Sequence, residues 1–271
     1  MNITYNQNHL RLWKTYGLSI PYAGLAKLGR DWKSPKASSP FSRLYYIVKG
    51  QGTIQLDNHA TILEEGKVYL LPAGLPYGYL CDDYMEQLFF HINFTHLNGI
   101  DLFRGCDRIY SRDLTAGEMQ SVKQLYLSDS IADAFCLKGI LLQELSGFLH
   151  MAGIGESHVR QYSPLVEQVF NLAQNPVDVG RHVSDLAGQL HVSASTLTKR
   201  FRQETGMSPG EYLTQLVITK ACNLLLTDTY PIAEIAKELG FTDQFYFAKY
   251  FKKQMLISPS GYRRQMSGSQ L

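Results

Sequence analysis

The chain has 271 residues, a formal net charge of +2 and 18% charged residues. This length is sufficient for two ordinary domains, and 45% hydrophobic residues is typical of a folded protein rather than a disordered one. The sequence has no long apolar run of the kind that spans a membrane, and the N-terminus lacks the pattern of a secretory signal. The four cysteines form no CxxC pair, which is typical of reduced core residues. We therefore expect a cytoplasmic protein without a membrane span.

The net charge excludes a strongly basic nucleic-acid-binding chain, but the distribution of charge is uneven. Residues 160–271 hold 12 Lys and Arg against 9 Asp and Glu, a balance of +3. Residues 1–159 hold the remaining 14 and 15, a balance of −1. The sign of this asymmetry favours a nucleic-acid-binding C-terminal part only weakly, so the placement of the basic residues has to decide.

The first hundred residues have the pattern of short β-strands. Aromatic and β-branched runs alternate with turn signals that contain Gly, Asn, Asp and Pro. The expected strands are Leu44–Val48, Thr53–Leu56, Lys67–Leu71 and Gln87–Phe94, with a turn over Lys49–Gly52. Several short strands at regular spacing predict a sandwich or a barrel.

Helical spacing replaces the strand pattern from about residue 115. Residues 115–130 and 132–152 are rich in helix formers, and a linker is expected over 153–162. One face of the second helix carries an apolar stripe of Leu137, Leu141, Leu145 and Phe148. This stripe either packs on its own domain or mediates dimerisation, and periodicity alone does not distinguish the two.

The strongest pattern in the C-terminal part is an internal repeat. Residues 183–213 align with residues 232–263, first at an offset of 49 and, after one extra residue, at an offset of 50. Core-type residues coincide in the two copies, for example Leu197 with Phe247. We therefore interpret the region as a duplicated structural unit.

Each copy has the pattern of a helix, a short turn and a second helix, which defines a helix-turn-helix. The turns contain His191 and Gly240; glycine suits a positive φ, whereas His191 is a less comfortable occupant. Ser193 and Thr242 are the expected N-caps of the following helices. In such a unit the second helix lies in the major groove of DNA.

The outward faces of these second helices hold the candidate DNA-binding residues. Lys and Gln can hydrogen-bond base edges, Phe and Ala can contact a thymine methyl group, and some basic residues contact only phosphate. A solvated helix face is the alternative, which the repetition of the pattern in two copies disfavours. The candidates are Ser195, Thr198, Lys199, Arg202, Gln244, Phe245, Ala248, Lys249 and Lys252.

Several runs of residues in this part form one combined motif. They are FRQETGMSPGEYL, then A-x-x-LL from Ala221 to Leu225, then I-x-E-IA-x-E-x-GF from Ile232 to Phe241, then F-x-K-x-FKK…SP…YR from Phe247 to Arg263. The motif covers about residues 163–266 and resembles the AraC/XylS family of transcription regulators. The resemblance implies two helix-turn-helix units in successive major grooves, a joining helix from about Pro209 to Leu226, and RNA polymerase as a partner.

Two positions depart from that family pattern. Leu256 stands in the turn after the second recognition helix, where glycine is usual, and would cost about 1 kcal/mol if it needs a positive φ. Val217 stands where arginine is usual, so no contact is carried over to it.

The β-rich part resembles the small cupin-like barrel of the same family. The match rests on Y-x-x-x-x-G-x-G from Tyr45 to Gly52, L-x-x-G-x-V-x-L-L-P from Leu63 to Pro72 and the last strand ending at Phe94. It implies a barrel that can bind a small effector, followed by helices that can mediate dimerisation.

Aromatic faces with polar tips suit a sugar or another neutral polar metabolite, and they also suit an ordinary β-core. Arg43 could hold an anionic group of an effector. The candidate effector-binding residues are Arg43, Tyr45, Tyr77, Tyr79, His91 and Trp32.

The sequence therefore predicts an α+β protein with a cupin-like barrel domain over residues 1–152 and a DNA-binding domain over 163–271. The expected function is transcription regulation, with activation favoured by the resemblance and with a small-molecule effector, a sugar among the candidates, controlling DNA binding. The expected partners are double-stranded DNA, the effector, RNA polymerase and a second copy of the chain.

Two alternatives remain for the N-terminal domain. In the first it only dimerises or binds a protein partner. In the second it is a cupin enzyme, which would need a cluster of His and carboxylate metal ligands. The histidines available, among them His59 and His91, form no HxH pair, so we expect no catalytic residues, no metal and no cofactor.

Overall fold

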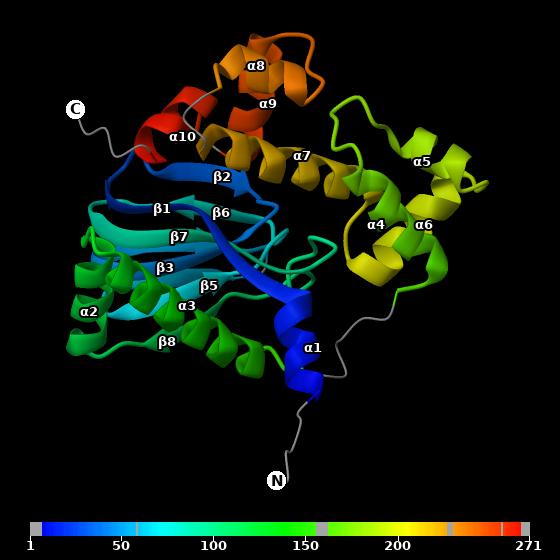
Figure 1. The fold of residues 1–271 in the computed structure, drawn as a ribbon. Coiled ribbons are helices and arrows are strands. Elements are labelled where there is room, and N and C mark those ends of the chain that lie inside the picture. The colour runs from blue at the N-terminus through cyan, green and yellow to red at the C-terminus, as the bar shows by residue number, and fades with distance from the viewer. Residues whose placement is uncertain (1–6, 58, 156–161, 227–229, 256, 267–271) are drawn as a thin grey trace. The chain divides into compact units, whose positions relative to one another are not determined.

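The computed structural model describes residues 7–57, 59–155, 162–226, 230–255 and 257–266. The chain divides into two compact units, Met1–Val159 and Arg160–Leu271, and each is described by itself (Figure 1). Most of the predicted linker and the Leu256 position lie outside the described residues.

The N-terminal unit is an antiparallel sheet followed by two helices. Its elements are α1 (Gln7–Thr15), β1 (Tyr16–Leu28), β2 (Lys33–Ala37), β3 (Ser42–Gln55), β4 (Ala60–Glu64), β5 (Lys67–Leu71), β6 (Tyr77–Leu80), β7 (Met85–His96), β8 (Tyr110–Asp113), α2 (Ala116–Tyr126) and α3 (Ile131–Met151). Strands run in the order β1-β7-β3-β5-β8, β6 pairs with β2 and β3, and β4 pairs with β3. The predicted cupin-like barrel with following helices is confirmed.

The predicted turn at Lys49–Gly52 is wrong, because β3 continues through it and joins two predicted strands into one. Up to Tyr46 the strand pairs with β5, and beyond Gly50 it pairs with β4 and β6. Gly50 has a φ of 72°, and a Cβ there would lie 2.2 Å from the Tyr84 backbone oxygen. The glycine therefore bends a continuous strand from one half of the sheet into the other instead of ending it.

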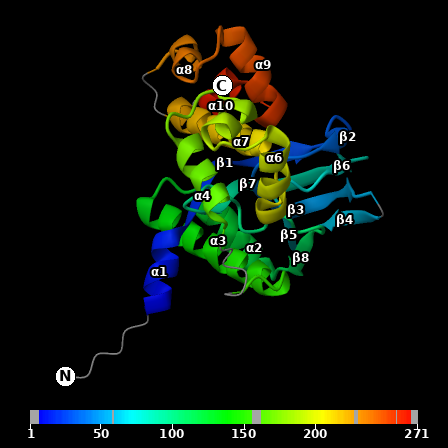
Figure 2. The ribbon, with the colours of Figure 1, turned by 90° about the vertical axis from the view of Figure 1, so that its right-hand side faces the viewer.

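Alternate residues of β3 face two separate hydrophobic clusters. Leu44 and Tyr46 pack with α2 and α3 on one face of the sheet. Tyr45 and Ile47 face the opposite way, into a cluster that residues of β4, β5 and β6 complete. The α2 and α3 helices thus cover one face of the sheet (Figure 2), and the other face encloses the second cluster.

The apolar stripe of α3 packs on its own domain. Its four members, Leu137, Leu141, Leu145 and Phe148, are at most 8% exposed and belong to the cluster under the sheet. The predicted dimerisation role of these four side chains is therefore corrected, because the sheet already covers them. A different face of α3 exposes other large apolar residues, among them Ile131, Phe135 and Leu142.

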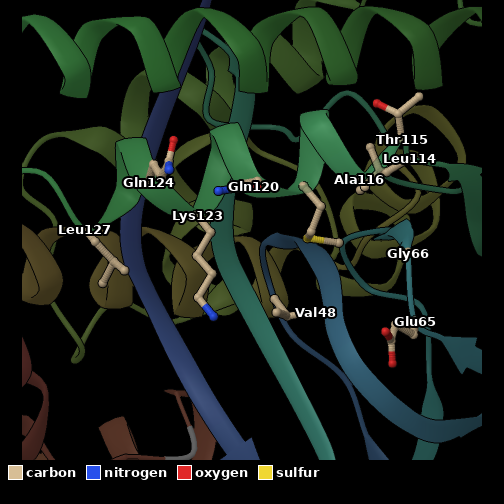
Figure 3. A pocket seen from close by; sticks show the side chains of 11 residues that line it. Val48, Glu65, Gly66, Leu114, Thr115, Ala116, Gln120, Lys123, Gln124 and Leu127 are labelled. Carbon is tan, nitrogen blue, oxygen red and sulfur yellow. The ribbon is translucent and has the colours of Figure 1, made fainter.

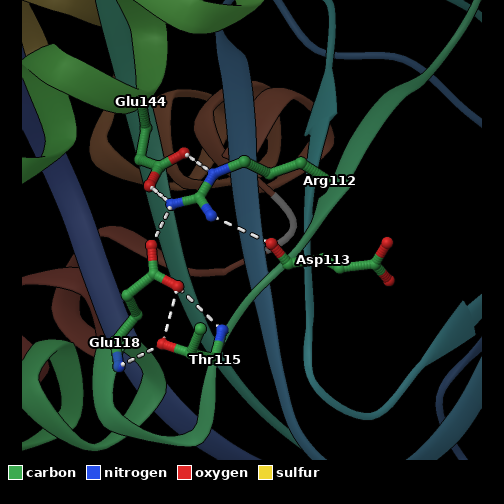
Figure 4. Close-up of polar contacts among 5 residues, drawn as sticks. All are labelled: Arg112, Asp113, Thr115, Glu118 and Glu144. Carbon is green, nitrogen blue, oxygen red and sulfur yellow. Dashed lines mark hydrogen bonds and ion pairs between the residues drawn. The ribbon is translucent and has the colours of Figure 1, made fainter.

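An ion cluster fixes α3 to the sheet edge beside that stripe (Figure 4). Arg112 of β8 donates two hydrogen bonds to the carboxylate of Glu144, which is 7% exposed, and a third to Glu118 of α2. Glu118 also completes a capping box with Thr115 at the start of α2. One guanidinium therefore joins a strand and two helices.

The C-terminal unit is entirely helical over its described residues. Its helices are α4 (Pro164–Gln174), α5 (Val183–Gln189), α6 (Ala194–Thr205), α7 (Pro209–Leu226), α8 (Ile232–Glu238), α9 (Gln244–Met255) and α10 (Pro259–Met266). The joining helix α7 has the predicted bounds, with α5 and α6 at one end and α8 and α9 at the other (Figure 1).

The two copies of the repeat share their turn and their core. His191 and Gly240, at the same place in the two turns, both have a positive φ, 54° and 79°. The ring pair Phe201 and Tyr212 of the first copy, with centroids 5.5 Å apart, corresponds to a pair 5.6 Å apart in the second copy. The duplicated helix-turn-helix fold is thus confirmed.

One predicted cap is correct and the other is displaced by a residue. Ser193 caps α6 by accepting a hydrogen bond from the Thr196 backbone. At α9 the backbone N–H groups of the first turn donate to Asp243, at 2.8 Å, and not to the predicted Thr242. The extra residue of the second copy is therefore Thr242 itself, and Asp243 is the counterpart of Ser193.

Candidate nucleic-acid interface and barrel site

The outward face of α6 carries the predicted residues of the first copy. Leu197 and Phe201 are fully buried, which leaves Ser195, Lys199 and Arg202 exposed and Thr198 half-buried. Lys199 and Arg202 line a groove of about 670 Å³ that continues over the start of α7. The groove follows the outward face of α6 from Ala194 to Arg202.

The outward face of α9 is built in the same way but has different chemistry. Phe247 and Phe251 are fully buried. The exposed residues are Gln244, Phe245, Lys249 and Lys252, and Ala248 is half-buried. Phe245 stands out, since 77% of this large apolar residue is exposed.

The basic residues of the two faces coincide at an offset of 50. Lys199 corresponds to Lys249, and Arg202 corresponds to Lys252; we call these the four duplicated cations. Within the described part of the chain, none of the four pairs with a carboxylate. Arg200, which lies outside the face on α6, does form such a pair, with Glu204 at 2.7 Å. Two helices thus present unneutralised positive charge at equivalent places.

Val217, where the family usually has arginine, is 2% exposed and lies in the core of the unit. It therefore adds nothing to the outward faces.

The six candidate effector residues form one connected cluster in the N-terminal unit. Arg43 contacts the hydroxyls of Tyr45 and Tyr77. Tyr77 lies beside Tyr79, whose ring is 4.6 Å from that of Trp32. His91 joins from the other side through Phe41, on which its ring stacks at 4.6 Å and over which Arg43 also lies.

Two members of this cluster were missed by sequence reasoning. Phe41 lies two residues before Arg43 on the same face of the chain, a spacing that could have indicated it. Tyr22 contacts His91 with ring centroids 5.1 Å apart. No signal could have indicated Tyr22, because strand β1 was itself not predicted.

Arg43 is a buried charge without a counter-charge. It is 3% exposed, and among the described residues no carboxylate pairs with it and its Nε has no hydrogen-bond partner. Burial alone would lower the pKa of Arg43. The surrounding tyrosine hydroxyls raise this pKa by more than burial lowers it, so the guanidinium stays charged. Burial, with the charge of Arg43, lowers the pKa of His91 well below its usual range, so the imidazole is neutral.

The N-terminal unit has a hollow between α2 and the β4–β5 turn (Figure 3). It has a volume of about 710 Å³, with Val48 and Leu127 among its apolar residues and Lys123 at its edge. Lys123 is already paired with Glu86 at 2.8 Å. None of the candidate effector residues lines this hollow.

The described residues contain no group of three or more His, Cys, Asp or Glu side chains able to hold a metal ion. Nor does any helix in the described ranges have the length and apolar character needed to cross a bilayer.

Known proteins resemble this chain both locally and over its full length. The family described as a helix-turn-helix domain matches residues 186–265. The raffinose operon transcriptional regulatory protein RafR of Pediococcus pentosaceus is 29% identical over 240 residues, covering 82% of this chain and 84% of that protein. The lactose operon transcription activator of Staphylococcus xylosus is 24% identical over 273 residues, covering 94% and 97%.

Among solved structures, unsaturated fatty acid bound ToxT from Vibrio cholerae shares the fold. It matches with a TM-score of 0.59 and 15% identity over 95% of this chain and 98% of that chain.

A cupin-like barrel followed by a duplicated helix-turn-helix unit defines this chain as a DNA-binding transcription regulator. More narrowly, the resemblance to transcription regulators of the AraC/XylS type is confirmed by the helix-turn-helix domain over residues 186–265 and by the operon regulators to which most of the chain is similar.

Proposed function

We propose that this regulator is a transcription activator that contacts DNA through α6 and α9 and is controlled by a small oxygen-rich effector, a sugar being the first candidate. The observation that carries the DNA contact is the set of four duplicated cations, exposed and free of carboxylate partners in the described chain. Activation is supported by the similarity to the Staphylococcus xylosus relative, which is named a lactose operon transcription activator.

Electrostatics give the DNA contact a measurable signature. A cation that neutralises a DNA phosphate releases counterions, so its loss lowers the slope of binding affinity against salt concentration by about one. If the cation contacts a base instead, its loss reduces the sequence selectivity of binding. We therefore expect Lys199→Ala and Lys249→Ala each to weaken specific binding, through either effect.

The matched control is Arg200→Ala, which removes the same charge from α6 at a site where the guanidinium is paired with Glu204. Binding is measured by fluorescence anisotropy over a salt series, on DNA selected from a random pool by the purified protein. We expect the control to retain the binding of the unmodified chain. If both lysine variants also bind the selected DNA as the unmodified chain does, the assignment of the recognition faces is wrong.

The effector proposal rests on Arg43. An unpaired buried polar group costs about 1–3 kcal/mol, so the unpartnered Nε of Arg43 and Nδ1 of His91 call for a ligand that supplies acceptors and donors. Sugar hydroxyls do both, and the aromatic rings of Trp32 and Tyr79 at the edge of the cluster suit the faces of a sugar ring. The relatives named for raffinose and lactose operons support the same class of ligand.

A thermal-shift screen of the full chain against sugars and sugar acids tests this. A ligand at about a hundred times its dissociation constant adds about 2.7 kcal/mol to the stability of the unit that binds it. Tyr77→Phe removes one hydroxyl from the cluster and should reduce the shift, whereas Tyr69→Phe, on a different strand, should retain it. A saturable shift that neither variant alters would place the effector outside the Arg43 cluster.

A second candidate function for the N-terminal unit is dimerisation, and the exposed apolar residues of α3 favour it. Phe135 is 71% exposed and Ile131 78%, and the two lie four residues apart on one face of α3, where neighbouring exposed apolar residues indicate an interaction surface. Cys136 is exposed next to Phe135, so a short thiol cross-linker should join two copies if this face is the interface. Cys136→Ser is the control for the cross-linking. If sedimentation shows a monomer for both the unmodified chain and Phe135→Ser, this interface is refuted.

A further inference from the structure

The two recognition faces share their charges but differ at the positions between them. At an offset of 50, Ser195 corresponds to Phe245 and Thr198 corresponds to Ala248. The first copy thus has hydroxyl groups where the second has an aromatic ring and a methyl group. The duplicated cations keep their charge, whereas these two positions between them change from hydrogen-bonding to apolar side chains.

Phe245 is held in place without being part of a core. Its backbone N–H donates to Asp243 at 2.8 Å, which fixes it in the first turn of α9. The next residue, Tyr246, packs its ring against Phe241 at 5.6 Å. Phe245 itself has no ring partner among the described residues and is 77% exposed. The helix therefore presents an apolar ring at the end that such helices direct toward base edges.

We propose that Phe245, with Ala248 one turn further on, reads the C5-methyl group of thymine in the half-site bound by the second helix-turn-helix. This inference rests on the proposed recognition faces. Thymine is the base whose major-groove edge carries a methyl group, and phenylalanine and alanine offer no hydrogen bond to any base. The first copy, with Ser195 and Arg202, reads hydrogen-bonding edges instead, so the two half-sites differ in sequence.

The flanking charges identify DNA as the occupant of this apolar surface. Lys249 lies four residues after Phe245 on the same face, and Lys252 lies one turn beyond. An apolar ring followed on the same helix face by two unpaired lysines fits a thymine methyl group with DNA phosphates nearby. A protein partner that buried this ring would instead bring those lysines against its own surface.

The size of the effect follows from the burial of one methyl group. Removing a methyl group from a buried contact weakens binding by about fourfold. Replacing thymine by uracil in synthetic DNA removes that group alone, because the base pairing is unchanged. The methyl contribution is therefore measurable one base at a time.

The experiment uses the full chain and DNA selected by it from a random duplex pool. Each thymine of the selected site is replaced by uracil in turn, and affinity is measured for the unmodified chain and for Phe245→Ala. At one or two neighbouring positions we expect uracil to weaken the unmodified chain by about fourfold. At those positions the Phe245→Ala variant should bind thymine and uracil equally.

Two variants separate this contact from a general loss of binding. Phe245→Leu keeps an apolar side chain and should keep part of the thymine preference. Arg200→Ala, which lies outside the recognition face of α6, should leave the thymine preference unchanged.

Every other outcome overturns the inference. It fails if no thymine is selected, if uracil has no effect, or if uracil weakens the unmodified chain and Phe245→Ala equally. It fails also if Phe245→Ala retains its DNA selectivity but loses transcription activation, which would make the ring a contact for the transcription machinery. If the pool yields no selected sequence at all, the DNA-reading function itself is refuted, and the inference falls with it.

Discussion

His191 offers a direct test of the duplicated turn. It occupies the position of Gly240 in the other copy and is the one non-glycine residue with a positive φ in the described chain, at 54°. A side chain in this left-handed region places its Cβ close to the following carbonyl oxygen. Replacing it with glycine, His191→Gly, should therefore relieve strain without changing the turn.

The magnitude is the difference between two opposing terms. The left-handed conformation costs an ordinary residue about 1–2 kcal/mol. Glycine loses about 0.5–1 kcal/mol more conformational freedom on folding than alanine does. The net gain for His191→Gly is about 0.5–1 kcal/mol, which raises the unfolding temperature of a unit this size by about 2–6 °C.

The reverse change in the other copy should be costly. In Gly240→Ala a Cβ would lie 2.2 Å from the Oδ2 of Asp178, and the residue would keep a φ of 79°. Strain and contact together should cost about 1–3 kcal/mol. The two substitutions therefore shift stability in opposite directions.

The assay can observe the two units separately. Both tryptophans of the chain, Trp13 and Trp32, lie in the N-terminal unit, so their fluorescence follows that unit alone. Far-ultraviolet circular dichroism follows the helices, most of which belong to the C-terminal unit. His191→Gly should raise the helical transition and leave the tryptophan transition unchanged. A helical transition equal to or below that of the unmodified chain would refute the strain argument.

Three further predictions concern the N-terminal unit and are read from tryptophan fluorescence in urea. Arg112→Ala leaves the buried carboxylate of Glu144 without its partner and should cost about 2–3 kcal/mol; an unchanged midpoint would show that water replaces the guanidinium. Thr115→Ala removes the threonine hydroxyl from the capping box but keeps the backbone N–H that donates to Glu118. Because the hydroxyl helps to lower the pKa of Glu118 to about 2, the variant should cost about 1 kcal/mol at pH 7 and less as the pH falls toward 2. Burial raises the pKa of Asp101 to about 6, so the folded chain holds a proton between about pH 4 and 6 that the unfolded chain does not. The stability contributed by this group therefore falls as the pH rises through that window, and a titration in which Asp101→Asn keeps the same slope would contradict this.

The C-terminal unit was predictable because its sequence states the same structure twice. Two aligned copies identified the core positions and the turns, and the family resemblance supplied the bounds of α7. The displaced cap at Asp243 came from placing the extra residue after the turn, which aligned Thr242 with Ser193. Both Thr242 and Asp243 are good caps by type, so residue preference could not decide between them.

The barrel was predicted in kind but not in detail. Strands rich in aromatic and β-branched residues were recognised, whereas β1 was missed because its half-exposed residues include Gly, Ala and Lys. Gly50 was read as a turn, since a bend and a turn need the same backbone freedom. The stripe on α3 was found, but the surface that it meets depends on the sheet, which lies elsewhere in the sequence.

The net charge of +2 shows why total charge is a weak guide to a nucleic-acid partner. In this chain several cations are neutralised locally, as Arg200 is by Glu204 and Lys123 by Glu86. Such a pair would have to be broken before its cation could bind a phosphate. The free energy lost with the pair offsets much of the free energy gained from the phosphate contact. The four duplicated cations carry no such pair in the described chain. Their lack of partners, repeated at equivalent positions on two helices, is therefore stronger evidence for a DNA-binding face than their number, and it explains how a nearly neutral protein can bind a polyanion.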